Sequence, residues 1–165
     1  MKPELTAAFN DQITREFSSS YQYLAMAAWL EAHSYPGMAH WMRLQSEEEW
    51  AHGTRFYQFV LDRNQAVELG PIPAPDVAFD SPLAVFRRSL AAEQGVTAAI
   101  NDLYALATEL RDYASLPLLD WFVNEQVEEE ATVSQVIDDL ERAGGEGHAL
   151  LMLDRELGAR VGGAG

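Results

Sequence analysis

The sequence contains no cysteine, which excludes disulfides and zinc sites built on thiolates. It also has no run near the roughly 18 apolar residues that a membrane-spanning helix needs, and the N-terminal stretch MKPELTAAFNDQ lacks the apolar segment of a secretory signal. Basic residues are scarce: 11 Lys and Arg stand against 26 Asp and Glu, which gives a formal net charge of −15. Such a surface repels nucleic acids and anionic membranes and attracts cations. We therefore expect a cytoplasmic protein with neither nucleic acid nor membrane as a partner.

Proline is also sparse, and its placement divides the chain into long uninterrupted segments. Four of the seven prolines lie within residues 69–82, which predicts an extended connection there. Apolar residues recur at spacings of three and four in the remaining segments, as they do in amphipathic helices. The length suits one domain over residues 1–165. We expect an all-α four-helix bundle with a long crossover between its second and third helices and a short fifth helix. The expected helices cover about 4–33, 38–64, 82–112, 116–143 and 146–158.

Each long apolar stripe is interrupted near its middle by ionisable or amide side chains. An unpaired carboxylate in a bundle core costs several kcal/mol or stays protonated. One interruption could be accidental, but a whole set at one level of a bundle requires a cation. The interrupting residues are Glu16, Glu49, His52, Glu93, Gln126 and Glu129.

The spacing of these residues repeats between the two halves of the chain. Glu16 and Glu93 are 77 residues apart, and the pairs Glu49–Gln126, His52–Glu129 and Glu48–Glu125 have the same separation. The two halves therefore present matching polar patterns, as a pseudo-two-fold arrangement would. Glu49 and His52 lie three residues apart and so share one helix face. An oxygen-rich donor set with one histidine suits Fe, Mn or Mg, and the central position of Glu49 suggests that it bridges two ions.

Four segments give the chain a resemblance to bacterial non-haem ferritins over almost its whole length: TREFSSSYQY, EEEWAHGTRF, AAEQGVTAAI and WFVNEQVEEE. The resemblance implies a ferritin-like bundle with a di-iron ferroxidase centre inside one subunit. Its first iron would be held by Glu16, Glu49 and His52, and its second by Glu49, Glu93 and Glu129, with Gln126 close by. Tyr23 matches a tyrosine that either donates an electron or hydrogen-bonds a ligand. A possible third iron site would use Glu48, Glu125, Glu128 and Glu129.

The same resemblance implies a cage of 24 subunits that oxidises Fe(II) with O₂ or peroxide and stores ferric mineral inside. Haem-binding relatives place a methionine just after the bridging glutamate, where this chain has Trp50. Tryptophan cannot ligate haem iron, so no haem is expected.

Two other functions remain open from the residues alone. One is a miniferritin-type stress protein that shields DNA, although such proteins build their metal site across two subunits. The other is a non-catalytic helical scaffold whose carboxylates bind no metal. Some individual roles are open as well. Gln126 could ligate a metal or only hydrogen-bond a ligand, and Glu48, Glu125 and Glu128 could form a third site or an ordinary acidic surface.

Overall fold

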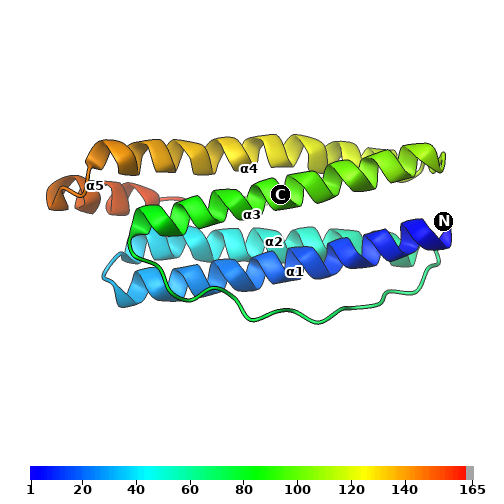
Figure 1. Ribbon diagram of the computed structural model, residues 1–165, viewed down its shortest axis with the longest axis horizontal. Helices are drawn as coiled ribbons and strands as arrows, with labels where there is room; N and C mark the ends of the chain where they lie inside the picture. Colours follow the sequence, from blue (N-terminus) through cyan, green and yellow to red (C-terminus); the bar gives the residue numbers. More distant parts are fainter. Residues whose placement is uncertain (163–165) are drawn as a thin grey trace.

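The computed structural model describes residues 1–162, so the last three residues of the expected domain lie outside it. Within the described range the chain forms helices only, and the expected all-α bundle with a short fifth helix is confirmed (Figure 1). The helices are α1 (Pro3–Ala32), α2 (Pro36–Asp62), α3 (Pro82–Glu109), α4 (Leu116–Ala143) and α5 (Gly147–Leu157).

The crossover of residues 63–81 fixes the topology of the bundle. It runs the length of the molecule and returns the chain to the end where α2 began, so α3 runs parallel to α2 (Figure 1). Helix α1 packs against α2 and α3, and α3 packs against α4. Within the described residues, no Cα atom of α2 comes within 8 Å of one in α4. The bundle is therefore tight between α1 and α3 and wider between α2 and α4.

Several helix ends differ from the expected ends by one to three residues. Helix α2 begins at Pro36, because proline is compatible with the first turn of a helix. Helix α1 has already ended at Ala32. Helices α2 and α3 end earlier than expected, at Asp62 and Glu109. Soon after these ends Asn64 and Arg111 adopt positive φ angles of 53° and 54°. A left-handed residue reverses the chain direction, so the helix cannot continue through it.

The hydrophobic core consists of two clusters rather than one. The first includes Tyr23, Met38, Phe86 and Val133 and lies toward α5, and the second includes Phe9, Phe56, Ile100 and Phe122 at the other end. The residues that interrupt the apolar stripes lie between them, and all are at least 93% buried. Among residues 1–162, none of the helices has the length and hydrophobicity needed to cross a bilayer.

Helix α5 is attached to the beginning of α2. The carboxylate of Asp154, which is 5% exposed, accepts a hydrogen bond of 2.9 Å from the backbone N–H of Met38 in the first turn of α2. The side chain of Tyr35, the N-cap residue of α2, makes no capping hydrogen bond, so α5 supplies the cap. Gly37 permits the approach, since a Cβ there would lie 1.7 Å from the backbone oxygen of Asp154.

Replacing Asp154 with alanine should detach α5 from α2. The loss of a buried cap costs about 1–2 kcal/mol, and we expect faster amide exchange across residues 147–157 in hydrogen–deuterium exchange. Glu156→Ala, on an exposed position of the same helix, is the control and should leave the exchange unchanged. Equal protection in both variants would show that the Asp154 cap does not hold α5.

Candidate metal centre

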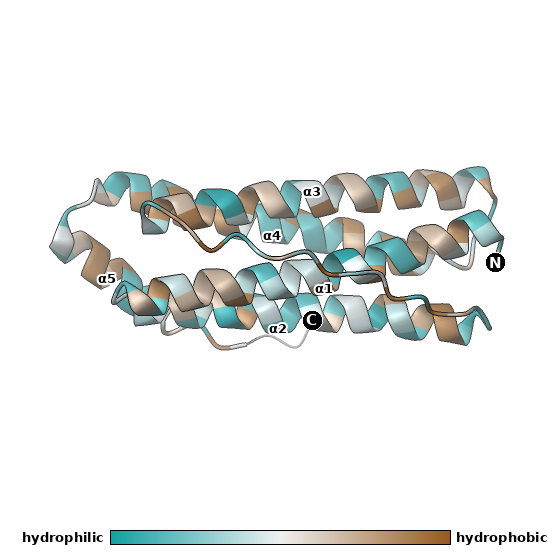
Figure 2. Ribbon diagram, turned by 60° about the horizontal axis from the view of Figure 1, so that its bottom comes forward, coloured by the Kyte–Doolittle hydropathy of each residue, from teal (hydrophilic) through white to brown (hydrophobic). Residues whose placement is uncertain are grey.

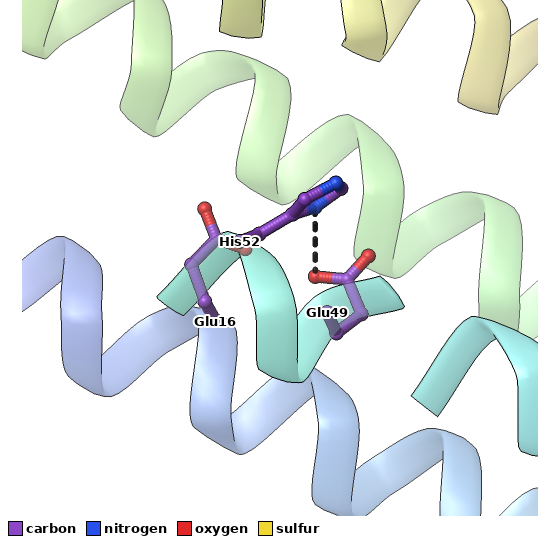
Figure 3. Close-up of side chains that lie close together, drawn as sticks. All are labelled: Glu16, Glu49 and His52. Carbon is purple, nitrogen blue, oxygen red and sulfur yellow. Dashed lines mark ion pairs between the residues drawn. The ribbon is translucent and has the colours of Figure 1, made fainter. Parts of the chain in front are cut away.

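Three side chains from α1 and α2 meet inside the bundle. Glu16, Glu49 and His52 each offer a ligand atom, and these atoms lie within 4.8 Å of one another. Figure 3 shows Glu16 reaching from α1 toward the two residues of α2. All three are at most 3% exposed. This spacing allows one ion to contact all three residues.

Most polar atoms of this group have no hydrogen-bond partner within the described residues. This holds for one oxygen of Glu16, both oxygens of Glu49 and Nδ1 of His52. The Oε2 of Glu49 lies 3.9 Å from Nδ1 of His52, too far for a hydrogen bond. Buried polar atoms without partners are strongly disfavoured. Their number and convergence fit a cation, which would satisfy all of them.

Glu93 from α3 is held by hydrogen-bond donors on two helices. The hydroxyl group of Tyr23 donates to Oε1 of Glu93, and it also lies 2.8 Å from the hydroxyl oxygen of Ser89. The amide of Gln126 lies 3.3 Å from Oε2 of Glu93, while its own oxygen has no partner among the described residues. Tyr23 and Gln126 thus orient Glu93, and Gln126 retains a free acceptor.

Glutamine amides orient two further carboxylates. Gln45 donates to Oε2 of Glu129 at 2.8 Å, and Gln12 donates to Oε1 of Glu16 at 2.7 Å. Both glutamines are at least 97% buried. They escaped the sequence prediction, although each lies four residues before a predicted ligand on the same helix face, where a buried amide can act as a donor.

Glu93 and Glu129 do not join the group of three. Among residues 1–162, only Glu16, Glu49 and His52 form a set of three or more ligand atoms within 4.8 Å of one another. Glu93 and Glu129 nevertheless lie close enough to act on Glu49. Burial raises the pKa of Glu49 well above its ordinary value, and the charges of Glu93, Glu16 and Glu129 raise it further. Glu49 is therefore the electrostatic centre of the site.

Two other carboxyl groups of the layer have strongly raised pKa values. Burial raises the pKa of Glu16 to about 7, and the hydrogen bond from Gln12 offsets this only in part. Burial and the charge of Glu93 raise the pKa of Glu129 to about 8. Near neutral pH these groups thus hold protons that a metal ion would displace.

His52 is neutral at physiological pH. Burial, followed by the positive charge of Arg55, lowers its pKa to about 4. The rings of Trp121 and Phe122 each stand edge-on to the imidazole with centroids 5.5 Å away and cover part of it. A neutral imidazole has a lone pair available for a metal.

Gly53 allows α1 and α2 to approach each other at this level. A Cβ at that position would lie 2.6 Å from the ring of Phe17 and 3.2 Å from the Cβ of Glu16. Any larger residue would push α1 away and separate Glu16 from Glu49 and His52. The sequence places this glycine directly after His52, but only the packing reveals its role.

A cavity of about 780 Å³ opens the site toward the space between α2 and α4. Its lining includes His52 and all four residues of the expected third site: Glu48, Glu125, Glu128 and Glu129. Partial burial raises the pKa of Glu125, and the neighbouring charges of Glu128 and Glu48 add to this. The structure therefore brings the four glutamates to one cavity, with His52 at its inner end.

Comparisons with known proteins agree with this architecture. The ferritin-like domain family matches residues 6–143. A bacterial non-heme ferritin of Staphylococcus epidermidis is 41% identical over 160 residues, covering 97% of this chain and 96% of that protein. One from Staphylococcus aureus is 38% identical over 161 residues, covering 98% and 97%.

Solved structures give the same result for the fold. An open-pore ferritin from the archaeon Archaeoglobus fulgidus superimposes with a TM-score of 0.96 at 37% identity, over 98% of this chain and 99% of that one. A humanized archaeal ferritin superimposes with a TM-score of 0.98 at 36% identity, over 99% of both chains. The match of sequence and fold extends over nearly the whole molecule, and the chain belongs to the ferritin family.

Proposed function

We propose that this protein is an iron-storage ferritin that oxidises Fe(II) at a di-iron centre within each subunit. One ion is held by Glu16, Glu49 and His52, and the other by Glu49, Glu93 and Glu129. The observation that carries the proposal is the convergence of buried donor atoms without hydrogen-bond partners in the described chain around Glu49. Bacterial non-heme ferritins are the chain's relatives at about 40% identity, which supports the same assignment.

The donor set favours iron. Carboxylate oxygens with a single imidazole suit Fe(II) and still serve Fe(III), a harder ion that prefers oxygen. Two Fe(II) ions supply the two electrons that reduce O₂, with two protons, to H₂O₂. Where H₂O₂ is the oxidant, a separate pair of Fe(II) ions supplies two electrons that convert it, with two protons, to two water molecules. The product Fe(III) then hydrolyses to the stored mineral.

The residues around the ligands have supporting roles in this scheme. Tyr23 and Gln126 hold Glu93, and Gln45 holds Glu129. The free oxygen of Gln126 can accept a hydrogen bond from a metal-bound group or contact the second ion. Glu48, Glu125, Glu128 and Glu129 bind a third ion in the cavity between α2 and α4, which is the iron's route to or from the centre.

The cage of 24 subunits is a separate part of the proposal. The crossover carries hydrophobic positions along the outside of α1 (Figure 2), and Leu69, Ile72 and Val77 there are 61%, 44% and 66% exposed. Trp50 on α2 is 58% exposed. Exposed apolar residues of this size favour contacts with further copies of the chain.

The two alternative functions have less support. A miniferritin would complete its metal site with residues of a second subunit, whereas Glu16, Glu49 and His52 meet within one chain. A non-catalytic scaffold would bury several unpaired carboxylates at a cost of several kcal/mol each without a compensating ligand.

Glu49→Gln should slow Fe(II) oxidation strongly, because the amide cannot bridge two cations as a carboxylate does. We expect the oxidation rate to fall by at least about 10- to 100-fold, the loss that follows when residues supporting metal ligands are replaced. The initial rate is read as ferric absorbance after aerobic addition of Fe(II). Glu109→Gln, which removes an exposed carboxylate at the end of α3, should oxidise at the wild-type rate. Equal rates in the two variants would refute the catalytic proposal.

Stability of the metal-free protein should fall as the pH rises from 6.5 to 8. The raised pKa values of Glu16 and Glu129, about 7 and about 8 against an ordinary 4.5, mean that the folded state binds more protons than the unfolded state in this window. His52, with its pKa lowered to about 4 from 6.5, makes stability rise with pH, but mainly below pH 6.5, where the unfolded imidazole is protonated. Calorimetry of metal-free protein at several pH values measures the effect.

The matched control for this pH dependence is the double variant Glu16→Gln/Glu129→Gln, which removes these two titrating groups and keeps Glu49 and Glu93, whose pKa values are also raised. Its melting temperature should vary less between pH 6.5 and 8 than that of the wild type. Identical slopes would mean that the two buried carboxyl groups do not govern stability in this window.

Assembly is tested by analytical ultracentrifugation of the native protein. A 24-subunit cage sediments far ahead of a single 18.4 kDa chain. We expect one dominant large species, and a double variant Leu69→Ser/Ile72→Ser should shift the population toward smaller species. A wild-type protein that sediments as a monomer or dimer would refute the cage while leaving the metal centre untouched.

A further inference from the structure

The chain beyond α5 turns back along α2 toward the metal centre. Gly158 lies against Gly37 at the beginning of α2, where a Cβ on Gly158 would be 2.9 Å from the Cα of Gly37. The backbone oxygen of Arg160 lies 3.0 Å from Nε2 of His40, one turn further along. A Cβ on Gly162 would be 3.3 Å from the side chain of Leu44. Residues 158–162 therefore follow α2 in the direction of the cavity.

The guanidinium group of Arg160 reaches the wall of that cavity. Its Nη2 donates to Oε2 of Glu48 at 2.8 Å, its Nη1 donates to Oε1 of Gln45, and its Cζ lies 4.8 Å from the centroid of the Trp41 ring. The Arg160 and Glu48 side chains are only 24% and 16% exposed. Such a partly buried, multiply bonded pair is stronger than an ordinary surface ion pair.

The contact with Gln45 extends the influence of Arg160 to a predicted iron ligand. Gln45 accepts from Arg160 through its oxygen and donates through its nitrogen to Glu129. An amide bonded at both ends has one orientation, so Arg160 fixes which atom of Gln45 faces Glu129. The chain of contacts runs from the C-terminal segment to the carboxylate.

The net negative charge of the residues that line the cavity attracts cations. Five glutamates and two arginines line it. The second arginine, Arg55, is stacked on Trp121 at 3.8 Å, whereas Arg160 bonds directly to a glutamate of the expected third site. A metal ion bound by Glu48 would share that carboxylate with the guanidinium group of Arg160, and the two positive charges would repel each other.

We propose that Arg160 is a tethered counter-ion of the outer metal site and a positioning residue for Glu129. It neutralises Glu48 and orients Glu129 through Gln45 while the cavity holds no metal. A divalent ion that binds Glu48, Glu125, Glu128 and Glu129 displaces the guanidinium group, so occupancy of this site is linked to release of residues 158–162. The inference rests on the proposed metal centre and adds a competing cation from the chain itself.

Anaerobic titration with Co(II) tests the proposal, because Co(II) binds such sites without being oxidised by them under these conditions. The number of bound ions and their dissociation constants are measured by equilibrium dialysis. Arg160→Gln should tighten the weakest, outer ion by about tenfold, the effect of removing one unit charge beside a divalent ion in a hydrated cavity. Arg160→Lys keeps the charge and should stay near the wild type. The inner ion held by Glu16, Glu49 and His52 should bind equally in all three proteins. The ion that Glu129 helps to hold should bind more weakly in Arg160→Gln, because Gln45 then loses the contact that orients it toward Glu129.

Arg155→Gln is the matched control, because it removes the same charge from an exposed position of α5 and should not change the outer ion. Wild-type protein that binds Co(II) but shows the same outer affinity after Arg160→Gln would overturn the counter-ion inference alone. Wild-type protein that binds no Co(II) would overturn the metal centre and this inference together.

A second measurement needs no variant. Hydrogen–deuterium exchange of wild-type residues 158–162 should accelerate when Co(II) is raised past the occupancy of the inner ions, since the segment loses its anchor. Exchange in α3 should remain constant. Unchanged exchange of residues 158–162 at full occupancy would contradict displacement.

Discussion

Repulsion among buried carboxylates is the constraint on which the rest of this structure depends. Glu16, Glu49, Glu93 and Glu129 lie in one layer, and none is more than 7% exposed. The layer divides the core into two apolar clusters, whose packing must hold the helices together on either side of an electrostatically unfavourable region. Amide and hydroxyl groups donate to at least one oxygen of each outer member of the layer. Glu49, at the centre, has no such donor in the described chain, and its remaining means of compensation are a proton or a cation.

The polar layer is packed tightly on one side of the bundle and borders a cavity on the other. Gly53 brings α1 close against α2, which shuts the layer off from solvent on that side. Helices α2 and α4 stand farther apart and leave the acidic cavity between them. The protein thus combines a buried group of donor atoms with an open cavity lined by glutamates. The pseudo-two-fold repeat explains the placement of the ligands, but not this difference between the sides.

The polar layer could be predicted from sequence because helix periodicity fixes which residues face the core. A glutamate in the middle of an apolar stripe, as at Glu16 or Glu93, faces the core at a high energetic cost unless it binds a cation or a proton. The long crossover was equally predictable from its prolines. The helix ends at Asp62 and Glu109 were not, because neither asparagine nor arginine, the residue types at positions 64 and 111, requires the left-handed conformation found there.

The residues that orient the carboxylates were harder to predict from the sequence. Gln45 and Ser89 act through neighbours on other helices, and no local pattern reveals which carboxylate a buried amide will meet. Arg160 was the hardest case, since its position near Glu48 depends on how α5 docks and how the chain leaves it. The distance between these residues in sequence, more than a hundred positions, removes any periodic signal.

The crossover has one further consequence. Because it makes α3 run parallel to α2, each helix pair in direct contact within the four-helix bundle is antiparallel. The peptide macrodipoles of neighbours then oppose one another and largely cancel. Glu16 also lies near the middle of a 30-residue helix, roughly 20 Å from either terminus, where a macrodipole has little effect. The backbone therefore contributes almost no field at the candidate metal centre, and the charge of an ion held there would be balanced by side chains alone.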